Sequence, residues 1–84
     1  ALLQNYPNPF NPETTISYHL AAGGRVRLEL YNSRGEMVER LVDDFQTPGP
    51  YRVVWNARGR AAGVYFCQLV SGAGVETRKM LLVK

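Results

Sequence analysis

The chain has 84 residues, of which 45% are hydrophobic and 20% charged, and its ten Lys and Arg face seven Asp and Glu. This length allows one domain with one core, and the composition is that of a globular chain. The basic residues are scattered, without the clustered tract and interleaved aromatics of a nucleic-acid binder. Apolar runs such as Met80 to Val83 are far shorter than the roughly 18 residues of a membrane-spanning helix. Because the chain opens on Ala1 without an initiator methionine, we expect it to be part of a longer protein.

The first half of the chain predicts a proline-rich lead-in followed by strands. Residues 4–12 read QNYPNPFNP, which disfavours helix and predicts an extended lead-in over residues 1–13. Thr15 to Leu20 and Arg25 to Tyr31 alternate polar and apolar residues, as half-buried strands do. In the second of these, Val26, Leu28 and Leu30 are expected to face the core, and Arg25, Arg27 and Glu29 the solvent.

The second half predicts four more strands separated by turns. Asn32 to Gly35 has the residues of a tight turn and predicts a hairpin into Glu36 to Val42. Asp43 and Asp44 are interpreted as a turn, and two prolines around Gly49 interrupt the chain again. Further strands are expected over 51–56, 63–70 and 75–83.

These six strands, or seven with Leu2 to Asn5, predict an all-β fold over residues 14–84. No segment with a helical period lies between them to make a parallel crossover, so the sheets must be antiparallel. We therefore predict one domain over residues 1–84, built as an antiparallel immunoglobulin-like β-sandwich of six to seven short strands. Its core is expected to contain Leu28, Trp55, Tyr65 and Cys67.

No catalytic or metal-binding constellation stands out, so the chain is predicted not to be an enzyme and to need no cofactor. His19 is the only histidine and lies among polar strand residues, without carboxylate, thiol or imidazole partners at ligand spacing. Cys67 is the only cysteine, so no intramolecular disulfide can form. The pair Asp43 and Asp44 lacks the closely spaced oxygen ligands that a calcium loop requires.

Two features remain open to more than one interpretation. Trp55, Tyr51 and Tyr31 could form a sugar-stacking platform, although the single tryptophan of a small sandwich more often lies in the core. The last strand is apolar on both faces over Met80 to Val83. It is either buried on both sides or an edge strand that awaits a partner.

A tyrosine two residues before Cys67 fits a corner motif of immunoglobulin-type sandwiches. In that motif the tyrosine hydroxyl folds back onto upstream backbone and closes a corner between strands. Gly63, Tyr65 and Cys67 have the required spacing, so Cys67 is expected to be a small buried hydrophobe on the core face.

Five segments in order resemble the C-terminal sorting domain (type A) of the type IX secretion system: QNYPNPFNPETTISYHL, VRLELYNSRGEMVERLVDD, YRVVWNARG, GVYFCQL and ETRKMLLVK. The resemblance covers about Leu3 to Lys84 and implies a fold similar to immunoglobulin-like modules, including one in the flagellar hook-capping protein. The family's Gly-x-Tyr motif falls on Gly63 and Tyr65. Departures from the family pattern are Ala61-Ala62, where proline often precedes the glycine, and Cys67, where an aromatic is common.

The resemblance implies that the chain is a sorting signal for export. Members of this family look to be recognised by the outer-membrane type IX machinery after the precursor reaches the periplasm. A sortase-like peptidase then commonly removes them and attaches the upstream passenger to the cell surface. The family's terminal basic and apolar motif falls on Lys79, Met80, Leu81, Leu82, Val83 and Lys84, the expected translocon-recognition residues.

Two other classes remain as alternatives: a carbohydrate-binding module and a structural spacer of an extracellular enzyme. The first would present an exposed row of aromatic side chains and bind glycans. The second would bind nothing, and its deletion would leave export intact.

Overall fold

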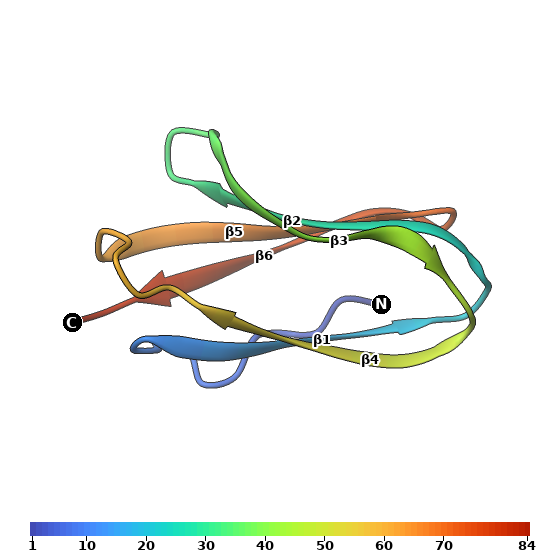
Figure 1. The fold of residues 1–84 in the computed structure, drawn as a ribbon, viewed down its shortest axis with the longest axis horizontal. Coiled ribbons are helices and arrows are strands. Elements are labelled where there is room, and N and C mark those ends of the chain that lie inside the picture. The colour runs from blue at the N-terminus through green and yellow to red at the C-terminus, as the bar shows by residue number, and fades with distance from the viewer.

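The computed structural model describes all 84 residues, which form six β-strands in two layers (Figure 1). The two layers are antiparallel sheets, one of order β1-β4 and the other of order β3-β2-β5-β6, packed face to face as a sandwich. The predicted all-β antiparallel sandwich is therefore confirmed, with six strands. Their bounds are β1 Glu13–Leu20, β2 Gly24–Asn32, β3 Met37–Gln46, β4 Gly49–Asn56, β5 Gly63–Ser71 and β6 Gly74–Leu82.

The core lies between the two sheets and is built by the alternation of each strand. Successive strand residues point to opposite faces, so every second side chain enters the core. Leu28, Trp55, Tyr65 and Cys67 are each at most 5% exposed, as predicted. The full core consists of Leu2, Phe10, Ile16, Tyr18, Leu20, Val26, Leu28, Leu30, Trp55, Ala57, Tyr65, Cys67, Leu69, Met80 and Leu82.

The turn between β2 and β3 has the predicted side-chain chemistry. The Asn32 Oδ1 atom accepts hydrogen bonds from the backbone N–H groups of Arg34 and Glu36, both at 3.0 Å. Gly35 has a φ of +85°, which favours glycine over residues with a side chain. The hairpin is thus closed by a local asparagine bond and one glycine.

The prediction of a turn at Asp43 and Asp44 was wrong, because both residues lie inside β3. Asp43 continues the ladder opposite Arg27 and accepts hydrogen bonds from the Arg25 guanidinium, the shorter at 2.7 Å. These bonds lower the pKa of the Asp43 carboxyl below its ordinary value. Cross-strand ion pairing therefore stabilises Asp43 in the strand, although aspartate is disfavoured in strands. Asp44 forms no ion pair, and its Oδ1 accepts a hydrogen bond from the Phe45 N–H at 2.8 Å. The chain crosses to the other sheet only at Thr47 and Pro48.

Glu29 also departs from the sequence prediction. It lies on the outer face of β2, as its alternation requires, but is only 4% exposed. One carboxylate oxygen accepts from the Tyr31 hydroxyl at 3.0 Å, and the other from Arg40 Nε at 2.8 Å. Neighbouring side chains thus cover a residue that the pattern assigned to solvent, and both of its oxygens are satisfied.

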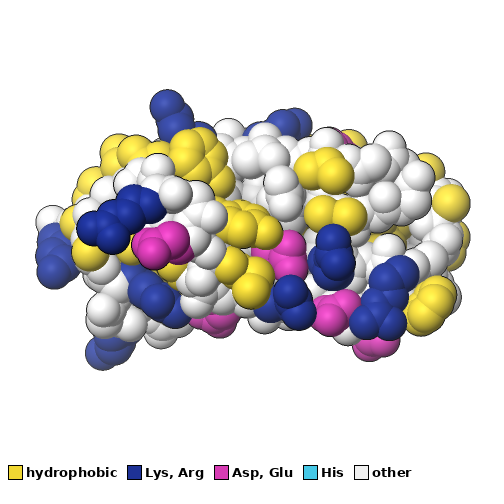
Figure 2. Space-filling model, turned by 90° about the horizontal axis from the view of Figure 1, so that it is seen from above, with side chains coloured by type: hydrophobic (Ala, Val, Ile, Leu, Met, Phe, Trp, Pro, Cys, Tyr) yellow, Lys and Arg dark blue, Asp and Glu magenta, His cyan; other side chains and the backbone are white.

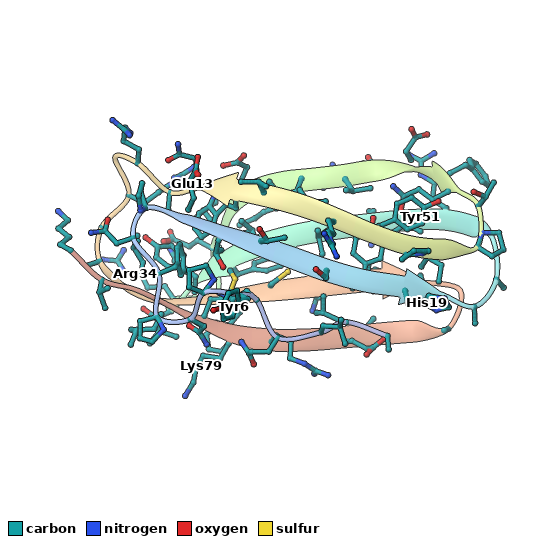
Figure 3. All side chains as sticks on the ribbon, turned by 90° about the horizontal axis from the view of Figure 1, so that it is seen from below. Tyr6, Glu13, His19, Arg34, Tyr51 and Lys79 are labelled. Atoms are coloured by element: carbon teal, nitrogen blue, oxygen red, sulfur yellow. The ribbon has the colours of Figure 1, made fainter.

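The lead-in runs along the open side of the sandwich, between β1 and β6 (Figure 3). Leu2 and Tyr6 form isolated bridges to β1, and Phe10 forms a parallel bridge to Leu82 of β6. The bridges do not make a seventh strand. Leu2 and Phe10 are at most 1% exposed, so the lead-in contributes to the core. It joins two sheets that share no strand.

Candidate functional site

The C-terminal residues alternate between core and surface. Met80 and Leu82 are 0% and 4% exposed, whereas Leu81 and Val83 are 38% and 39% exposed. Lys79 and Lys84 are exposed. The strand is therefore buried on one face only, and Leu81 and Val83 are the apolar residues available to a partner.

The fold brings the Gly-x-Tyr motif next to this segment. β5 and β6 are antiparallel, and their register places Gly63 opposite Leu82 and Tyr65 opposite Met80. Gly63 opens β5 with a φ of +144°, a value that side chains disfavour. Two segments that the sequence separates by 13 residues, 66–78, thus form one structural unit.

Tyr65 closes the corner that its spacing predicted. Its ring is 5% exposed and meets the Trp55 ring edge-on, with 5.4 Å between the centroids. Its hydroxyl donates to the backbone oxygen of Ala61 at 2.6 Å. The bond fixes the loop between β4 and β5 onto the start of β5, next to the C-terminal strand.

Tyr65→Phe is expected to lower the free energy of unfolding by about 1 kcal/mol, because the Ala61 carbonyl loses its donor while the ring stays packed. Urea denaturation measures the change. Tyr6→Phe is the matched control, since the Tyr6 side chain is 81% exposed and its hydroxyl forms no hydrogen bond within the chain. Equal stability of the two variants would contradict the corner.

The lead-in covers the outer backbone edge of β6, which the sequence did not reveal. Leu81 N–H donates to Asn8 Oδ1 at 2.9 Å, and Leu81 C=O accepts from Phe10 N–H at 3.0 Å. Val83 N–H donates to Phe10 C=O at 3.0 Å, and Lys79 C=O accepts from Gln4 Nε2 at 2.8 Å. The only sequence signal was the run of amide side chains between prolines in the lead-in. The edge around residues 79–83 is thus occupied within the chain.

Unpaired positive charge remains around the C-terminal strand. Four of the ten Lys and Arg residues form ion pairs, namely Arg25, Arg34, Arg40 and Arg60. Neither Lys79 nor Lys84 forms one. Their charges are therefore free to face an acidic partner.

The other candidate residues do not assemble into a site. Trp55 is 1% exposed, so Trp55, Tyr51 and Tyr31 form no exposed platform. His19 is exposed on β1, and burial raises the pKa of the Cys67 thiol to about 12. No group of three or more His, Cys, Asp and Glu side chains is placed to hold a metal ion. No helix of the chain is long and apolar enough to span a membrane.

Comparison with known families supplies the identity. The family model of the secretion system C-terminal sorting domain matches residues 4–84, nearly the whole chain. The comparison with curated proteins gave no match. Members of this family carry a type IX secretion signal, which is not itself catalytic and which implies interaction with the type IX machinery and export to the cell surface or beyond. The chain belongs to the family of secretion system C-terminal sorting domains.

Proposed function

We propose that the chain directs an upstream passenger from the periplasm through the outer-membrane type IX translocon. A sortase-like peptidase then removes the chain and anchors the passenger at the cell surface. Within the chain, Lys79, Met80, Leu81, Leu82, Val83 and Lys84 are the recognition segment, with Gly63 and Tyr65 as its structural support. Residues 1–13 are the lead-in and residues 14–84 the sandwich of one sorting domain.

The observation that best supports this proposal is that buried and exposed apolar residues alternate within residues 79–84. Met80 and Leu82 anchor the segment in the core, while Leu81 and Val83 are partly exposed between two unpaired lysines. Apolar surface next to unpaired charge is suited to specific protein recognition. The carbohydrate-binding alternative loses its support, because the aromatic side chains it needs are not exposed together.

Export of a reporter fused upstream of the chain tests the proposal, in a bacterium with a type IX system. The double variant Lys79→Glu/Lys84→Glu is expected to reduce the exported fraction at least about tenfold, because like charges would face each other at the receptor. The variant should fold, since exposed substitutions change stability by less than about 0.5 kcal/mol each. The exported reporter should also be smaller than its precursor by up to the 9.4 kDa of the chain.

Arg27→Glu/Arg52→Glu is the matched control. Both arginines are exposed, neither forms an ion pair, and their reversal changes the net charge equally. This control should be exported normally. Normal export of the folded lysine variant would exclude recognition of these charges, and retention of the unmodified fusion would favour a structural spacer.

A further inference from the structure

A partner can reach the C-terminal strand either along its backbone edge or through its outward side chains. Adding a strand to β6 would require free backbone groups along its outer edge. The lead-in already bonds the outward groups of Leu81, the Val83 N–H and the Lys79 carbonyl. Phe10 lies in the core and fixes the lead-in there. While the lead-in is docked, the outward side chains of β6, such as Lys79 and Leu81, are accessible and this part of its backbone edge is not.

The outward side chains of β6 lie next to apolar residues of β5. On the outer face of the four-stranded sheet, the register places Leu81 beside Val64 and Lys79 beside Phe66. Tyr31 of β2 lies on the other side of Phe66. Hydrophobic side chains gather toward the left end of this face, the end that carries the C-terminus (Figure 2). We call Val64, Phe66, Lys79 and Leu81 the outer patch.

Lys79 is the only ionisable member of the outer patch and forms no ion pair. Glu29 lies on the same face, but its two carboxylate oxygens are bonded to Tyr31 and Arg40. Lys79 therefore lies beside Phe66 in the ladder, and no carboxylate neutralises its ammonium. A partner that covers the patch would bind it more tightly and more specifically if it presented apolar side chains around a carboxylate.

We propose that a protein of the type IX machinery binds the outer patch as a sheet face, through side chains, with the β6 edge still closed by the lead-in. This inference rests on the proposed function and adds Val64 and Phe66 of β5 to the recognition surface. Its partner is a protein surface with an apolar centre and a carboxylate facing Lys79. Strand addition at β6 is the competing mechanism.

The export assay tests the patch with pairs at opposite ends of the same face. Val64→Gln/Phe66→Gln is expected to reduce the exported fraction at least about tenfold, because both side chains lose apolar contact with the receptor. The control is Val70→Gln/Val75→Gln, a directly opposed pair of β5 and β6 at the other end of the face. It should change export by less than about twofold.

Milder variants keep the test valid if a glutamine pair does not fold. Val64→Thr keeps the shape and strand preference of valine and should reduce export about fivefold, whereas Val70→Thr should not. Gln4→Ala/Asn8→Ala removes two lead-in bonds from the β6 edge. Strand addition predicts higher export from this variant, and binding of the outer patch predicts no increase.

The controls separate this inference from the proposed function. Export of the unmodified fusion, together with loss in the lysine variant, establishes the sorting signal. Against that background, selective loss in the Val64 variants supports the outer patch. Normal export of folded Val64 variants, equal loss in the Val70 controls, or increased export of Gln4→Ala/Asn8→Ala would overturn it while leaving the sorting function in place.

Discussion

Trp55→Ala is expected to lower the free energy of unfolding by about 3–5 kcal/mol, a large part of the stability of so small a domain. Trp55 is 1% exposed, and its ring lies between Phe10 and Tyr65, at centroid distances of 5.7 and 5.4 Å. Its Nε1–H donates to Glu39 Oε1 at 3.2 Å, which ties β4 to the edge strand of the other sheet. Removing the ring therefore opens a cavity between the two sheets.

Thermal unfolding measures this effect as a fall in Tm of at least about 12 °C. Val54→Ala is the matched control, because Val54 precedes Trp55 on β4 but is 60% exposed on the outer face. The control should change stability by less than about 0.5 kcal/mol. Similar Tm values for Trp55→Ala and the control would show that Trp55 is not at the centre of the core.

Phe10→Ala is expected to cost a comparable amount, about 3–5 kcal/mol, although Phe10 lies outside every strand. Phe10 is 1% exposed and its ring packs against Trp55. Its backbone N–H and C=O form hydrogen bonds with Leu81 and Val83. Loss of the ring should also release the lead-in from β6. Amide hydrogen exchange at Val83, whose N–H donates to Phe10, should therefore accelerate more than exchange within β2.

Tyr6→Ala is the matched control for Phe10→Ala, because it truncates an aromatic residue of the lead-in that is not packed in the core. Tyr6 is an aromatic residue of the same segment, but 81% of it is exposed. Its truncation should cost less than about 0.5 kcal/mol. If Phe10→Ala were as harmless as Tyr6→Ala, the lead-in would not be part of the folded domain and the β6 edge would be open.

The lead-in is expected to matter for function because it lies against the segment that we propose for recognition, residues 79–84. The passenger is expected to precede residue 1. The bonds from Gln4, Asn8 and Phe10 place residues 4–10 beside residues 79–83, whereas Ala1 lies near His19 and Glu76, toward the start of β6. A substitution in the lead-in is therefore expected to affect recognition even though it lies more than 60 residues away in sequence.

Alternation predicted which residues enter the core, and it did so well for β2, β4 and β5. Val26, Leu28 and Leu30 are all buried, and Tyr65 forms its corner bond four residues upstream. The alternation rule assigned Glu29 to solvent, because it considers only the position of a residue along its own strand. It does not take into account the side chains of neighbouring strands. Tyr31 and Arg40 cover that carboxylate, and the partner strand β3 supplies Arg40.

The strands, the turn at Asn32 to Gly35, the core tryptophan and the family could be predicted from residue patterns, since each depends on local alternation or on the order of short motifs. Three features could not: Asp43 and Asp44 continue a strand, Leu81 and not Met80 faces outward, and the lead-in closes the β6 edge. These outcomes depend on contacts between distant segments, and a local pattern carries no information about which segments meet.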